Sequence, residues 1–159
     1  MLEYVSIPEE RMRLLRIDRR WEQKLKKFID VDVHLSDVVE IENPDLLVVL
    51  RVKLIFQAFG RGFDFEDALD LLDEDYVLEI IDISDYAKTK NRIVTLKGRV
   101  IGTKGKAKNI IVKQTETKIS IYGKTVAIIG RPENVANARD VVKIILSGKK
   151  HGTAFGFLE

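Results

Sequence analysis

The chain has 159 residues, and its 27 lysines and arginines nearly balance its 25 aspartates and glutamates, leaving a formal net charge of +2. This length suits two small domains, and 45% hydrophobic residues are enough to fill their cores. The absence of cysteine excludes disulfides, thiol nucleophiles and zinc-thiolate sites. No segment resembles a membrane span, and the charged start Met1-Leu2-Glu3 is unlike a signal peptide, so we expect a soluble cytoplasmic protein.

The first 62 residues are marked by a cluster of arginines at a predicted turn. Its members are Arg13, Arg16, Arg19 and Arg20. Arginines at such a turn could grip phosphates or a protein partner, or form the solvated face of a scaffold domain. The glycines of Gly60-Arg61-Gly62 then predict the end of a long helix.

An acidic segment, residues 63–75, separates the two halves. Ten carboxylates lie between Asp64 and Asp85, with no lysine or arginine among them. A short amphipathic helix is predicted by the helical spacing of Phe65, Ala68, Leu69 and Leu72. The junction is also rich in aromatic rings, namely Phe56, Phe59, Phe63 and Phe65. Since packing of the two halves together would bury these rings, we expect one unit without a flexible linker.

The second half, residues 76–159, predicts a regular order of elements. Residues 77–83 form a β-rich run, and the runs at 118–122 and 125–129 flank Gly123-Lys124, which predicts a hairpin. A helix with one buried face and Pro132 near its start follows. Its apolar residues recur at three and four, at Val135, Ala138, Val141, Val142 and Ile145.

Between the strand and the hairpin, a glycine-bounded tetrapeptide interrupts a helical pattern. It consists of Gly102, Thr103, Lys104 and Gly105. Glycines let the main chain approach a sugar or phosphate closely and allow a tight turn between two helices. Gly105 opens the second helix, whose free amides and dipole attract anions, and Lys106 and Lys108 add positive charge beside it. A purely structural turn would have the same glycines.

The charge around this turn is strongly one-sided. Eleven basic residues from Lys88 to Lys124 are opposed only by Glu116. A basic patch of this kind attracts phosphates through counterion release, so any such binding should weaken with salt.

The first half resembles the second as an internal repeat. At an offset of 86 residues Arg16 aligns with Gly102, Leu25 with Ile111, and Val33-His34-Leu35 with Ile119-Ser120-Ile121. Later in the repeat the offset is expected to grow to 88, which aligns Pro44 with Pro132 and Gly60 with Gly148. Arg16 and Arg19 replace the two glycines of the turn, which argues against close backbone contact with a ligand in the first copy.

In its element order and Gly-x-x-Gly turn, the second half resembles the eukaryotic-type KH domain, type I. The resemblance implies an α+β fold of order β-α-α-β-β-α, with a three-stranded antiparallel sheet and the helices on one face. Two tandem domains follow from the repeat, a degenerate one at residues 1–62 and one with the turn at 76–159. The resemblance also implies a clamp for about four nucleotides of single-stranded RNA. It places Ile119 and Ile121 along the groove for the bases, although their alternation is also that of core packing.

The residues argue against an enzyme. Gly123-Lys124-Thr125 matches only the end of a phosphate-binding loop, and a hairpin turn explains it. The carboxylates of Asp73-Glu74-Asp75 are expected to be solvated, and neither His34 nor His151 has a predicted nucleophile or third ligand beside it. We therefore expect no catalytic residue, metal or cofactor.

Over nearly its full length the chain resembles the archaeal relatives of the Partner-of-Nob-One family. The segments that carry this are Ile7-Pro8-Glu9-Glu10-Arg11, Gly60-Arg61-Gly62-Phe63, Ala68-Leu69-Asp70-Leu71-Leu72 and residues 151–159. The resemblance implies binding near the 3′ end of precursor small-subunit rRNA and partnership with the PIN-domain endonuclease that trims that end. It also allows His151 and Phe155 to stack on RNA, whereas a tail that only covers the domain is the alternative.

The expected mechanism begins with electrostatic capture and ends with bases in the groove. The capturing residues are Lys97, Arg99, Lys106 and Lys108. Main-chain contacts at residues 102–105 then fix the strand, with Arg16, Arg19 and Arg20 as secondary contacts to RNA or a partner. Two alternatives remain open, a general or exosome-type RNA-binding KH protein and a pure protein-interaction scaffold.

Overall fold

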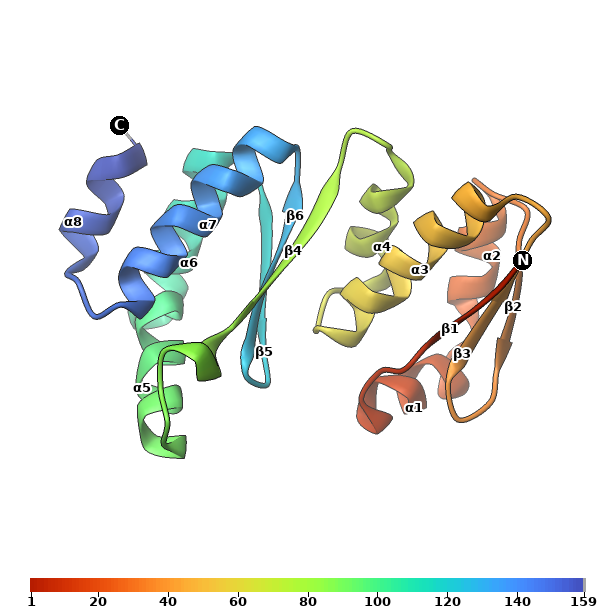
Figure 1. Cartoon of the computed structure of the whole chain (residues 1–159), viewed down its shortest axis with the longest axis horizontal. Coiled ribbons are helices and arrows are strands. Elements are labelled where there is room, and N and C mark those ends of the chain that lie inside the picture. The colour runs from red at the N-terminus through yellow and green to blue at the C-terminus, as the bar shows by residue number, and fades with distance from the viewer. Residues whose placement is uncertain (159) are drawn as a thin grey trace. The chain divides into compact units, whose positions relative to one another are not determined.

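A computed structural model describes residues 1–158, which divide into two compact units, residues 1–74 and the rest of the chain from residue 75. Each unit is α+β and contains one three-stranded antiparallel sheet (Figure 1). The first unit comprises β1 (Leu2–Val5), α1 (Glu9–Ile17), α2 (Arg20–Lys26), β2 (Asp32–Leu35), β3 (Val39–Glu42), α3 (Leu46–Gly60), α4 (Phe65–Ala68) and the 3₁₀ helix η1 (Leu69–Leu72).

The second unit repeats this order, including a short α-helix and a 3₁₀ helix at its end, and adds the 3₁₀ helices η2 and η3. It comprises β4 (Val77–Asp82), η2 (Ile83–Asp85), α5 (Lys90–Ile101), η3 (Thr103–Gly105), α6 (Lys106–Thr115), β5 (Lys118–Tyr122), β6 (Thr125–Gly130), α7 (Pro132–Leu146), α8 (His151–Phe155) and η4 (Gly156–Leu158). The predicted strand, hairpin and long helix are confirmed, except that Ile83 already belongs to the 3₁₀ turn.

The two sheets have the same topology, β1-β3-β2 in the first unit and β4-β6-β5 in the second. In both sheets the last strand in sequence, β3 or β6, lies in the middle and pairs antiparallel with both of its neighbours. The two units thus share one sheet topology and one order of main elements, as the repeat predicted. That the first unit is a degenerate KH domain stays a prediction.

The expected growth of the repeat offset to 88 residues is wrong. Helices α3 and α7 each have 15 residues and begin at Leu46 and Pro132, which keeps the offset at 86. Pro44 precedes the N-cap of α3, whereas Pro132 is the first residue of α7. Gly62 and Gly148 are the true equivalents, with φ of 98° and 95° after the two helices.

Gly60 has a different role from the turn glycines that follow α3 and α7. It is buried, and a Cβ atom there would lie 2.6 Å from Cγ2 of Ile7. Gly60 therefore allows α3 to pack closely on the segment after β1.

The second unit's core lies between its sheet and α5, α6 and α7, which cover one face (Figure 1). All five residues predicted for the buried face of α7 are inaccessible or nearly so. They pack with sheet residues such as Val126 and Ile128. At about 25 cal/mol per Å² of apolar surface, this burial is the main stabilising contribution to the unit.

The segment after α3 is not the single amphipathic helix that was predicted. It forms α4 and η1, with Phe65, Ala68 and Leu71 buried and Leu69 and Leu72 only half-buried. A 3₁₀ helix has three residues per turn, so every third residue faces the same side. The segment packs on α3, where the Arg51 side chain donates to the Leu71 carbonyl at 3.1 Å.

The aromatic rings near the junction already have partners within the first unit. Phe56 and Phe65 lie 5.5 Å and 5.8 Å from the Trp21 ring, and Phe59 lies 6.2 Å from Phe65. The Arg11 guanidinium covers the Phe59 ring at 4.1 Å. These rings therefore do not require the two units to pack together, and that packing stays a prediction.

Candidate nucleic-acid interface

Both glycines of the turn between α5 and α6 have a positive φ, and Gly102 also lies where a side chain would collide. Gly102 has φ 76°, and a Cβ atom there would lie 2.6 Å from the backbone nitrogen of Ala107. At Gly105 the nearest atom to a Cβ would be Nδ2 of Asn109 at 3.9 Å, so space is available, but φ is 75°. Both glycines thus allow a backbone with positive φ, and Gly102 in addition allows the start of α6 to pack closely.

Between these glycines the chain projects into solvent. Thr103 and Lys104 are exposed, and Lys104 itself has a positive φ of 56°. Non-glycine residues adopt this conformation uncommonly. The Gly105 amide donates to the Gly102 carbonyl at 3.1 Å and closes the turn.

Helix α6 begins directly after the turn, as predicted, with Gly105 as its N-cap. The Lys106 amide donates to the Thr103 carbonyl, and the cap provides no side chain for the amides that follow it in this ten-residue helix. Those following amides and the positive end of the dipole can serve an anion. Lys106 is exposed at the first position and Lys108 is half-buried one residue past Ala107. The turn, helix end and lysines together form a surface suited to a phosphate.

The two predicted basic residues on α5 differ in their contacts within residues 1–158. Lys97 is half-buried on the opposite flank of the helix from Arg99. Arg99 donates from Nη1 to the Ile145 carbonyl at 3.0 Å and from Nη2 to the Lys149 carbonyl. Arg99 therefore ties α5 to the end of α7, which leaves Lys97 as the better candidate for contact with RNA.

The predicted groove residues differ in burial. Ile119 is 5% exposed and belongs to the core, whereas Ile121 is half-buried and packs against the core's edge. The placement of Ile119 is that of core packing, the alternative left open by the sequence, and Ile121 is the more accessible to a base.

An exposed apolar stripe on α5 was missed from the sequence. Val94 is 67% exposed and Ile101 is 36% exposed, and between them lies Gly98, where a Cβ atom would have no neighbour within 4 Å. Their spacing of four and three residues places them on one face, away from the buried Ile93 and Leu96. The sequence did contain a signal for this stripe, because Val94 and Ile101 are apolar residues that fall outside the buried face of α5. The stripe leads into Gly102 and is open to solvent.

The arginines of the first unit's turn have local acidic partners. Arg16 bonds Glu9 at 2.7 Å and donates to the Ser36 carbonyl at 2.8 Å, and Arg19 pairs with Glu22. Hydrogen bonds from Arg20 lower the pKa of Asp18 to about 2. Much of the positive charge at this turn is therefore balanced within the unit.

The C-terminal segment lies against the second unit. The His151 and Phe155 rings stack on each other at 5.8 Å, and Nε2 of His151 is 2.7 Å from the Arg99 carbonyl. Ala154 is fully buried and Phe155 packs against the core. These contacts are those of a tail that covers the domain.

Within residues 1–158, no group of three histidine or acidic side chains is placed to hold a metal ion. No helix in the same range is long and apolar enough to cross a membrane.

The fold and the exposed Gly-x-x-Gly turn define a KH-type RNA-binding protein. A family model described as "Eukaryotic type KH-domain (KH-domain type I)" matches residues 77–159. The chain therefore belongs to the Partner-of-Nob-One family (PNO1, Dim2) of KH-type RNA-binding proteins. Members of this family include proteins that are named pre-rRNA-processing proteins.

Named relatives and solved structures agree with this assignment. A KH domain-containing protein of Methanocaldococcus jannaschii is 39% identical over 99% of this chain and 73% of its own length. The pre-rRNA-processing protein PNO1 of Chaetomium thermophilum is 34% identical over 64% of this chain, which spans only 40% of that protein.

The structural match extends over both units. Dim2p from Pyrococcus horikoshii superposes with a TM-score of 0.88 and 33% identity, covering 99% of this chain and 98% of that one. A second structure, a complex of a/eIF2alpha, aDim2p and rRNA from the same organism, matches with a TM-score of 0.89 and 32% identity, covering 99% and 92% of the two chains.

Proposed function

We propose that the chain binds single-stranded RNA near the 3′ end of precursor small-subunit rRNA and assists the PIN-domain endonuclease that trims this end. The chain itself does not cut the RNA. The relatives support this role, since one is named a pre-rRNA-processing protein and another was crystallised with rRNA.

The observation that carries the proposal is the geometry of the turn at residues 102–105. Its two glycines have positive φ, its middle residues are exposed, and it leads into a helix N-terminus. A phosphate can approach the main chain there without meeting a Cβ atom. The first unit has arginines in place of both glycines, so we assign the RNA to the second unit.

RNA binding begins with electrostatic attraction and ends with close contacts at the turn. Lys97, Lys106 and Lys108 attract the RNA backbone, and the turn then positions one phosphate on the amides that begin α6. Bases extend along the apolar stripe of α5 and the exposed edge of Ile121. Phosphate contacts set the register, and contacts to base edges provide the sequence preference. Binding weakens with salt because counterions are released. Arg99 contributes mainly by holding α5 in place.

The proposal is tested by fluorescence anisotropy with a labelled RNA that matches the 3′ end of small-subunit rRNA. A Thr103→Asp/Lys104→Asp variant should bind at least tenfold more weakly, because two carboxylates then face the phosphate. The matched control is Asn137→Asp/Lys143→Asp on exposed positions of α7, which changes the net charge equally.

The control variant should keep its affinity, and a scrambled RNA should bind more weakly than the rRNA sequence. Equal losses in both variants would show that only net charge matters and would remove the turn as the site. Equal affinity for both RNAs would support a general RNA-binding protein instead. Separate titration of the PIN-domain endonuclease tests the partnership, and absence of binding would remove that part of the proposal.

A further inference from the structure

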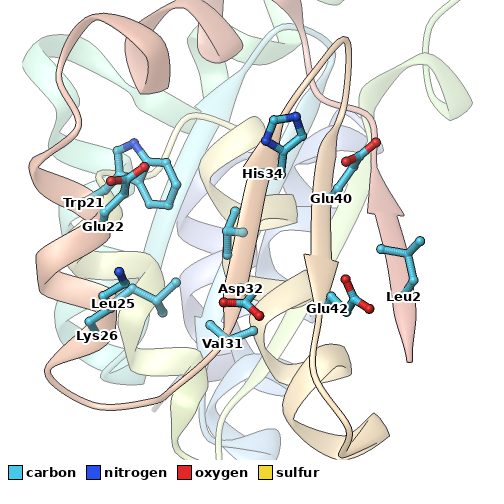
Figure 2. Close-up of a pocket in the computed structure, with 11 residues that line it drawn as sticks. Leu2, Trp21, Glu22, Leu25, Lys26, Val31, Asp32, His34, Glu40 and Glu42 are labelled. Atoms are coloured by element: carbon cyan, nitrogen blue, oxygen red, sulfur yellow. The ribbon is translucent and has the colours of Figure 1, made fainter.

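The first unit contains an open groove of about 210 Å³, lined by α2 on one side and by β2 and β3 on the other. Figure 2 shows Trp21 and Leu25 on α2, beside the strand that carries Asp32 and His34. Trp21, Leu25 and Val31 are each at most 5% exposed and supply apolar surface at the base of the groove.

The groove follows the open edge of a sheet. In the order β1-β3-β2, β2 is an edge strand whose pairing partner is β3. An edge strand presents unpaired N–H and C=O groups to an added strand. A polypeptide in extended conformation could therefore hydrogen-bond along Asp32–Leu35.

The strands that line the groove carry three carboxylates, whereas α2 contributes one glutamate and Lys26. Asp32 lies directly opposite Glu42 in the strand register, and Glu40 lies opposite His34 (Figure 2). Like charges directly opposite each other on neighbouring strands repel. A positively charged ligand would relieve this repulsion. Glu22, on the other side of the groove, is already paired with Arg19.

Two acidic positions of this groove correspond to lysines in the second unit. At the repeat offset of 86 residues, Glu22 corresponds to Lys108, and Asp32, which begins β2, corresponds to Lys118, which begins β5. At these two positions the same fold presents lysines in the unit with the RNA turn and carboxylates in this one, whereas β6, the counterpart of the strand with Glu40 and Glu42, carries no charged residue. Electrostatic complementarity selects an anionic ligand for the second unit and a cationic one for the first.

We infer that this groove binds an extended, basic segment of a protein partner, which adds a strand to the open edge of β2. Side chains of an added strand alternate between two faces. Lysine or arginine at alternate positions would face Asp32, Glu40 and Glu42, and small apolar residues between them would face Trp21 and Leu25. RNA does not suit this groove, because its phosphates would meet the carboxylates.

The test uses the full chain and a fluorescent octapeptide that alternates lysine with valine. The peptide should bind, and Asp32→Asn/Glu42→Gln, which removes charge with little change in shape, should weaken binding about tenfold. Hydrogen exchange should show protection of the β2 amides, residues 32–35, in the complex. A peptide that alternates glutamate with valine should not bind.

The matched control is Asp37→Asn/Asp140→Asn, which removes the same charge from exposed positions outside the groove. It should leave peptide affinity unchanged, and both double variants should keep wild-type affinity for RNA. The inference would be overturned if both double variants bound the peptide equally more weakly, or if the peptide did not bind at all. It would also be overturned if the peptide bound without protecting the β2 amides. Protection of residues 32–35 by single-stranded RNA would also overturn it and assign the groove to RNA. None of these results depends on Thr103 or Lys104, so the inference and the proposed RNA function fail separately.

Discussion

At the residue scale, the two glycines of the turn show how identical residue types serve different physical needs. A side chain at Gly102 would collide with the start of α6, whereas one at Gly105 would only be strained by its backbone conformation. The turn could be predicted from the spacing of the two glycines, because that spacing is a local feature of the sequence. It could not separate their roles, because these depend on where Ala107 lies.

Replacement of Gly102 by alanine should destabilise the second unit by about 1–3 kcal/mol, since the new Cβ atom would overlap the Ala107 backbone. Urea unfolding measures this change. Gly98→Ala provides the control, because a Cβ there meets no atom within 4 Å and the residue lies inside α5. It should stabilise the chain by about 0.5–1 kcal/mol. Equal unfolding midpoints for the two variants would contradict the steric role of Gly102.

Asp18 should give the first unit's turn a measurable dependence on pH. Hydrogen bonds from Arg20 lower the pKa of Asp18 to about 2. Because the folded pKa lies below the ordinary value of about 3.9, the stabilisation is present above about pH 4 and is lost as the pH falls towards 2. In Arg20→Ala, NMR titration of the Asp18 carboxyl should return a pKa near 3.9. An unchanged low pKa would show that Arg20 is not its cause.

At the element scale, the C-terminal helix α8 is held to the second unit by buried side chains and by contacts of one arginine of α5. Arg99 bonds the carbonyls of Ile145 and Lys149, and its own carbonyl lies 2.7 Å from Nε2 of His151. The basic flank of the turn predicted this arginine as an RNA contact. Sequence alone could not reveal the carbonyls it meets, because they belong to residues about fifty positions away.

Arg99→Met should loosen α8 without unfolding the unit, because a charged hydrogen bond contributes about 1.5–3 kcal/mol. Hydrogen exchange at residues 150–156 should accelerate about tenfold or more, whereas exchange in β6 should not change. Lys113→Met, at an exposed position of α6, serves as the control. Unaltered exchange at α8 would show that Ala154 and Phe155 hold the helix by themselves.

Elements with strong periodicity were predicted well. The buried face of α7 and the β5-β6 hairpin follow directly from apolar spacing and a glycine turn. The α4-η1 segment did not, because its tertiary contacts with α3 favour a 3₁₀ continuation and so bury Leu71 in place of Leu69 and Leu72. A helical pattern in the sequence assumes 3.6 residues per turn and misplaces the face when the turn is tighter.

At the scale of the whole molecule, one fold occurs twice with divided roles. Both units share the sheet order and the 15-residue length of the helix after the hairpin, yet only the second has the glycine turn, and the first has arginines that are paired with nearby acids. The repeat was detectable from the sequence, because aligned residues keep a constant spacing. The groove beside β2 was not, because it depends on strands that bring Asp32, Glu40 and Glu42 together.

The most direct test of this division is hydrogen exchange on the full chain, free and bound to single-stranded RNA matching the 3′ end of small-subunit rRNA. The account predicts protection at residues 102–108, around the turn and the start of α6, and no protection at residues 16–20 of the first unit. Protection at residues 16–20 without protection at 102–108 would contradict it and would assign the RNA to the arginines of the first unit.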